Sequence, residues 1–156
     1  MIWQILTPLI AAIFGTTVGS LLTWYLMTVS ARKQARREIL LKTAYALEAY
    51  RVAYALWYGE YLSPTAQQSG PWAKPPGGGD PRYLSLMKAV DMGRGRLRAL
   101  IGALYAHFRE DEIRPLYKDI TEVLVKSGPQ HADCRDVDII VEKACDLIPG
   151  MIRRSF

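Results

Sequence analysis

The chain has 156 residues, a formal net charge of +5 at pH 7 and a hydrophobic fraction of 50%. This length leaves room for one domain plus an anchor. Two cysteines, Cys134 and Cys145, are too few for a disulfide framework, and in a cytoplasmic domain they are expected to be reduced thiols.

The charged residues are distributed unevenly. Residues 1–31 contain no Asp, Glu, Lys, Arg or His, so every charged side chain lies from Arg32 onward. Between Arg32 and Lys42 there are five basic residues and one acidic residue, and the rest of the chain is close to neutral. A pI near 9.3 could indicate nucleic acid binding. Here the excess of positive charge is better explained as the flank of a membrane span.

The first 31 residues are predicted to be a transmembrane anchor. The run from Ile2 to Met27 is mainly apolar, and about 20 such residues are enough to cross a bilayer. Trp3 lies at one end of the run, and Trp24 and Tyr25 lie at the other, as is typical of aromatic side chains at the two membrane interfaces. A cleaved signal peptide is the alternative. It is disfavoured because the run has no basic start and is long for a signal peptide.

Four basic residues follow the anchor and predict its orientation: Arg32, Lys33, Arg36 and Arg37. Because such clusters stay on the cytoplasmic side, we expect a single-pass protein of the cell (inner) membrane. Its N-terminus would be outside and its domain in the cytoplasm. These side chains also suit anionic lipid headgroups, although setting the topology is a sufficient role for most of them.

One face of the predicted anchor carries small residues, which we call the small-residue strip. Gly15 and Gly19 have the spacing that lets two helix backbones approach closely in lipid. The strip predicts a contact with a second copy or with another membrane protein, although small residues are common in transmembrane helices in general. Its members are Ala11, Ala12, Gly15, Thr16, Gly19 and Ser20.

A basic juxtamembrane segment and one long helix are predicted over residues 32–62. Strong helix formers dominate its first half, and it contains no proline. A second membrane span is the alternative for its apolar second half. Lys42, Glu48, Arg51 and Glu60 disfavour that alternative, because each charge costs about 2.5–3.5 kcal/mol at the centre of a span.

The remaining chain predicts a flexible loop followed by three helices. Residues 63–81 are rich in proline and glycine, which exclude regular structure. Residues 82–156 are assigned to the remaining helices of the bundle. The first of them is expected over about 81–108, with Asp80 as its N-cap. The second is expected over 111 or 112–127 and the third over 135–148, where Pro149-Gly150 ends it. The predicted fold class is all-α, a transmembrane helix that continues into a cytoplasmic bundle of about four helices.

Candidate sites in the predicted domain are few. The soft metal ligands are His107, His131, Cys134 and Cys145. His131 and Cys134 have a short ligand spacing, but no second paired motif accompanies them, and Cys145 lies in an apolar helix, so a zinc site is disfavoured. Glu110, Asp111 and Glu112 are consecutive and suit a helix N-terminus better than acid–base catalysis. The basic residues Arg94, Arg96 and Arg98 favour pairing within the domain over nucleic acid binding.

We therefore expect a membrane-anchored, non-enzymatic interaction or scaffold protein. Its expected partners are the lipid bilayer and, through the small-residue strip, a second copy or another membrane protein. We expect no catalytic residue, no metal, no cofactor, no small-molecule ligand and no nucleic acid. The alternative is a small membrane-acting effector, for lysis, exclusion or toxicity, that oligomerises through its transmembrane helix.

Overall fold

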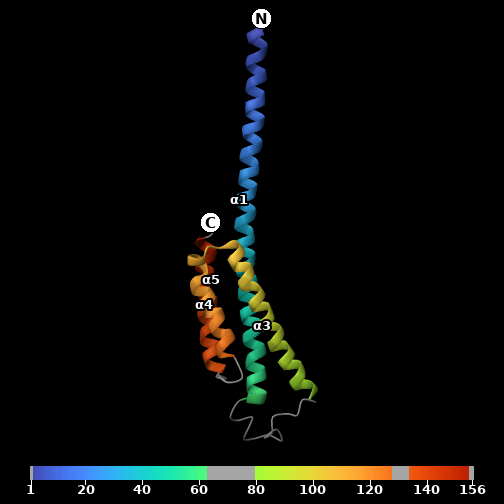
Figure 1. Ribbon diagram of the computed structural model, residues 1–156, viewed down its shortest axis with the longest axis vertical. Coiled ribbons are helices and arrows are strands. Elements are labelled where there is room, and N and C mark those ends of the chain that lie inside the picture. Colours follow the sequence, from blue (N-terminus) through green and yellow to red (C-terminus); the bar gives the residue numbers. More distant parts are fainter. Residues whose placement is uncertain (1, 63–79, 128–133, 155–156) are drawn as a thin grey trace. The chain divides into compact units, whose positions relative to one another are not determined.

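The computed structural model describes residues 2–62, 80–127 and 134–154, with the backbone alone at 2–15 and at 62. These residues are helical almost throughout (Figure 1). The predicted all-α class and the expected four helices are confirmed for them, and most of the predicted loop 63–81 lies outside them. The elements are α1 (Ile2–Trp57), the π-helical turn η1 (Tyr58–Leu62), α3 (Pro81–His107), α4 (Glu110–Lys126) and α5 (Cys134–Arg154).

The chain divides into two compact units, Met1–Ala35 and Arg36–Phe156. The first unit consists of the N-terminal part of α1. In the second unit, α4 packs along α5 and also against α3 (Figure 1). The remainder of α1 contributes buried side chains to the same core as these three helices.

Heptad spacing builds the core of the second unit. On α1, Leu40, Leu47 and Tyr54 are seven residues apart and fully buried. Helix α3 buries Val90, Leu97 and Leu104 at the same interval. Because seven residues are close to two helical turns, this interval keeps one face of each helix toward the core.

Helices α4 and α5 are amphipathic. The buried side chains recur three or four residues apart, as a single apolar stripe on each helix requires. They are Ile113, Leu116, Ile120 and Val123 on α4, and Val137, Ile140, Val141 and Ala144 on α5.

The helix starts follow local capping chemistry. Asp80 is the N-cap of α3, as predicted, and its carboxylate accepts a 2.9 Å hydrogen bond from the backbone N–H of Arg82. Helix α4 begins at Glu110, slightly earlier than predicted. The Glu112 carboxylate there accepts a 2.9 Å hydrogen bond from the backbone N–H of Arg109. This hydrogen bond satisfies a donor that the start of a helix leaves without a partner.

The predicted end of the last helix is wrong. Helix α5 does not stop before Pro149 but continues to Arg154. Proline removes one backbone hydrogen bond, which usually ends or kinks a helix. Here Ile148 is buried, and Met151 and Ile152 pack against the core. The burial of these side chains on both sides of Pro149 offsets the lost hydrogen bond and keeps the last turn helical.

Where side chains are described, which in α1 means from Thr16 onward, no helix has the combination of length and apolarity needed to cross a membrane.

Candidate functional site

The small-residue strip lies in the first unit and is partly described. Thr16, Gly19 and Ser20 are exposed, and a Cβ atom added at Gly19 would meet nothing within 4 Å. Ala11, Ala12 and Gly15 lie outside the residues whose side chains are described. The described half of the strip is therefore an open helix surface on which a second helix could pack.

Hydroxyl side chains of the first unit bond to their own helix. A serine or threonine can satisfy its hydroxyl by donating to a carbonyl one turn earlier, which leaves no hydrogen-bond donor for the surroundings to satisfy. Four such bonds of 2.8–3.0 Å run from Ser20 to the carbonyl of Thr17, Thr23 to Gly19, Thr28 to Trp24, and Ser30 to Met27.

Most of the predicted membrane-interface side chains are on the surface. Trp24 and Tyr25 are 67% and 60% exposed, and Arg32 and Arg37 are exposed as well. Lys33 is half-buried, and Trp3 lies outside the residues whose side chains are described.

Arg36, also predicted for the membrane interface, is a structural residue of the bundle. Its guanidinium lies 5.0 Å from the centre of the Phe108 ring, and its Nε donates a 2.7 Å hydrogen bond to the carbonyl of His107. A carboxylate oxygen of Glu112 lies 3.8 Å from the same guanidinium. A cation placed there caps the negative C-terminal end of α3. Sequence reasoning missed this role because the partner carbonyl is 71 positions away.

A buried polar cluster joins α1, α3 and the end of α4. The hydroxyl of Tyr50 donates to the hydroxyl of Ser127 and accepts a 3.3 Å hydrogen bond from Nε of Arg94. Arg94 also donates to the carbonyl of Ser127, the C-cap of α4. Tyr50 and Ser127 are fully buried, so the cluster replaces the water that these groups would otherwise bind. Its contacts account for its presence without any ligand.

Helix α3 approaches Tyr50 closely at Gly93. A Cβ atom at Gly93 would lie 2.7 Å from Cδ2 of the Tyr50 ring. Helix α3 runs unbroken through Gly93 and Gly95. The role of Gly93 is therefore to provide space for a buried aromatic ring.

Three of the four candidate metal ligands, His107, Cys134 and Cys145, lie within the described residues. Among the residues that the structure describes, no group of three or more His, Cys, Asp or Glu side chains could hold a metal ion. His107 is exposed, and His131 lies outside the described residues. The Cys145 thiol lies 3.8 Å from Oε1 of Glu48, and burial together with that carboxylate raises its pKa. A raised pKa keeps the thiol protonated and makes it a poor nucleophile.

The second unit also buries a carboxylate and a phenol. Asp119 is 2% exposed and pairs through Oδ1 with Lys143 at 3.0 Å. Burial raises the pKa of Tyr54 to about 12, so its hydroxyl stays neutral at physiological pH.

The second unit has an apolar groove between α1 and α3, which we call the α1–α3 groove. It has a volume of about 550 Å³. Tyr45, which lines it, is 79% exposed, and three of the other lining residues are alanines. The groove is lined by Lys42, Tyr45, Ala46 and Ala49 of α1 and by Arg96, Ala99 and Leu100 of α3.

The apolar surface extends along α1 beyond the groove. Leu41, Val52 and Leu56 are 42%, 55% and 51% exposed, and with Tyr45 and Ala49 they recur every three or four residues. That spacing places all five on one face of a helix. Contiguous exposed apolar surface of this kind marks interaction sites more often than scattered single residues do.

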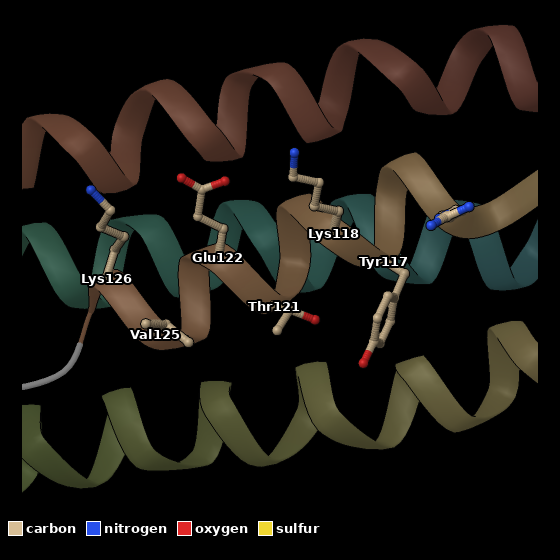
Figure 2. A pocket seen from close by; sticks show the side chains of 7 residues that line it. Tyr117, Lys118, Thr121, Glu122, Val125 and Lys126 are labelled. Carbon is tan, nitrogen blue, oxygen red and sulfur yellow. The ribbon is translucent and has the colours of Figure 1, made fainter.

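A second hollow of about 470 Å³ lies on the outer surface of α4. Figure 2 shows that Tyr117, Thr121 and Val125 extend on the side of α3, whereas Lys118, Glu122 and Lys126 extend on the side of α5. All residues that line it belong to one helix, so it is a shallow surface rather than a cleft between elements. The α1–α3 groove, with walls from two helices, is the better candidate interaction site.

The described part of the chain thus offers surfaces on which another chain could pack. Sequence reasoning missed the α1–α3 groove, although the unbroken alanine-rich and tyrosine-rich stretch of α1 was the available signal. Comparisons with protein-family models, with curated proteins and with solved structures found no match to this chain.

Proposed function

We propose that the chain is a membrane-anchored, non-enzymatic interaction protein. Its N-terminal apolar run would hold it in the cell membrane with the N-terminus outside. The helical second unit would lie in the cytoplasm and present the α1–α3 groove to a protein partner. The observation that carries the interaction role is the groove itself, because an exposed apolar surface with walls from two helices serves binding rather than folding.

The anchor is supported by the sequence and by the surface of the first unit. Residues 2–15 of the apolar run Ile2–Met27 lie outside the described side chains. In the described remainder, Val18, Leu21, Leu22 and Leu26 are each more than half exposed. The hydroxyls that bond back to their own helix suit a medium that supplies no hydrogen bonds.

The anchor is tested by extraction of native membranes. The full chain should remain in the membrane pellet after an alkaline carbonate wash and should be released by detergent. A single cysteine introduced before Ile2 should react with an impermeant thiol reagent in intact cells, and one introduced at Arg153 should not. Release of the chain by carbonate, or labelling at Arg153 alone, would refute the proposed topology.

The small-residue strip supports the alternative of an oligomeric membrane effector, because Gly19 is open to a second helix. A reporter of helix association in membranes should lose its signal when Gly15 and Gly19 are replaced by isoleucine. If induced expression also depolarises cells, and the double replacement prevents this, the effector role is favoured over the interaction role. Expression without toxicity favours the interaction protein.

A further inference from the structure

We infer that one end of the second unit binds the surface of an anionic membrane. This end, which we call the basic end, carries exposed arginines from α1, from the corner between α3 and α4, and from the last turn of α5. They are Arg37, Arg109, Arg153 and Arg154. Binding of this kind rests on the proposed anchor, because the anchor would bring the basic end to a bilayer.

Contacts within the second unit bring these elements together. Nε of Arg36 donates to the carbonyl of His107, the last residue of α3, and its guanidinium lies over the ring of Phe108. Arg154 of α5 lines a small hollow together with Phe108 and Glu112. Figure 1 shows the end of α5 beside the corner between α3 and α4. Each arginine of the basic end is one of these residues or its neighbour in the chain.

The charge balance at this end is positive. Within the residues that the structure describes, the four arginines take part in no ion pair. Two nearby carboxylates are already engaged, since Glu112 lies 3.8 Å from Arg36 and Glu38 lies 2.7 Å from Lys42. Two more are exposed in the first turn of α4, Glu110 and Asp111. Four arginines against these two carboxylates leave an excess of two positive charges.

The chain joins this end directly to the proposed anchor. Arg36 is the first residue of the second unit, and it lies nine positions after Met27, the end of the apolar run. Nine residues of helix are about 14 Å long. So short a tether gives the basic end a high effective concentration at the headgroups. Basic side chains near an anionic leaflet are attracted to it, and a guanidinium can donate two parallel hydrogen bonds to one phosphate.

Arg153 and Arg154 have a second possible role. Cations in the last turn of a helix complement its dipole, and both residues are in the last turn of α5. That role does not depend on lipid, and Arg37 does not share it because it lies inside α1. The composition of the membrane therefore distinguishes the two roles.

The test measures how accessible each arginine is in two kinds of bilayer. The full chain is placed in nanodiscs of phosphatidylcholine alone or with about 30% phosphatidylglycerol. Hydroxyphenylglyoxal then modifies accessible arginines, and mass spectrometry gives the extent at each site. Labelling of the basic end should be at least about threefold lower in the anionic discs, and about 1 M salt should abolish this protection. Arg98, exposed on α3 more than two turns before its end, should be labelled equally in both.

A pair of double variants tests whether the arginines act together. Arg153→Gln with Arg154→Gln removes the excess positive charge, so Arg109 should lose its protection in anionic discs. The matched control is Arg96→Gln with Arg98→Gln, which removes two exposed arginines of α3 and should leave Arg109 protected. All four substituted side chains are exposed, and circular dichroism checks that both variants fold. The comparison of two lipids with the original chain needs neither variant.

The possible failures are distinguishable. Equal labelling of the basic end in neutral and anionic discs overturns the inference and leaves the anchor in place. Protection that Arg98 shares to the same extent overturns it as well, because the lipid then acts on the reagent in general. Persistent protection of Arg109 in the Arg153 and Arg154 double variant has the same consequence. A chain that does not co-elute with phosphatidylcholine discs refutes the anchor, and binding by the basic end fails with it.

Discussion

Replacing Gly93 with alanine should destabilise the second unit, although alanine is the better helix former. The new Cβ atom would lie 2.7 Å from Cδ2 of Tyr50 and 3.6 Å from two further atoms of that side chain. The ring has no free direction in which to move. It is fully buried, its centre lies 6.0 Å from that of Tyr54, and its hydroxyl is bonded to Ser127 and Arg94.

Two opposing contributions determine how much Gly93→Ala changes the free energy of unfolding. Glycine to alanine within a helix gains about 0.8–1.0 kcal/mol of intrinsic helix propensity. Inserting a methyl group into a packed core costs about 1–3 kcal/mol. Gly95→Ala is the matched control, because Gly95 lies two residues along the same helix and a Cβ atom there would meet nothing within 4 Å. Propensity cancels between the two variants, so Gly93→Ala should be about 1–3 kcal/mol less stable than Gly95→Ala.

The assay is urea unfolding of the full chain, followed by circular dichroism at 222 nm, for the two variants and the original. Gly95→Ala should be as stable as the original chain or more stable. If Gly93→Ala proves at least as stable as Gly95→Ala, the proposed contact between α3 and Tyr50 is refuted.

Four further predictions concern polar groups of the second unit. Tyr50→Phe should lower the free energy of unfolding by about 1–3 kcal/mol, because it leaves the buried Ser127 hydroxyl without its donor. If urea unfolding shows the variant to be as stable as the original chain, the buried polar cluster of Tyr50, Arg94 and Ser127 is refuted. Lys143→Met should be at least about 1 kcal/mol more destabilising than Lys42→Met. The reason is that Lys143 pairs with the buried Asp119, whereas Lys42 pairs with an exposed glutamate. Similar unfolding midpoints for the two variants would contradict this prediction. The Cys145 thiol should react slowly with iodoacetamide at pH 8. Burial and the Glu48 carboxylate raise its pKa above the ordinary value of 9.0, so its thiolate fraction rises only at higher pH. Glu48→Gln should lower that pKa and speed the reaction of Cys145, measured by mass spectrometry against Cys134 in the same sample, and an unchanged rate would exclude a contribution from Glu48.

The helices of this protein follow from its local sequence. Asp80 before Pro81 starts α3, and the three- and four-residue spacing of Ile113, Leu116 and Ile120 determines which face of α4 is buried. These features need only neighbours along the chain, because capping and amphipathic spacing act within one or two turns. The charge-free N-terminal run and its basic flank are likewise properties of the sequence alone.

The contacts between those helices depend on the tertiary structure. Arg36 bonds the carbonyl of His107, 71 positions away, and Tyr50 bonds Ser127, 77 positions away. Local spacing contains no signal for such pairs. Packing also overrode a local rule, since burial of Ile148 carries α5 through Pro149. The α1–α3 groove arises in the same way, because its two walls are separate helices and their exposed apolar side chains form one surface only when the bundle assembles.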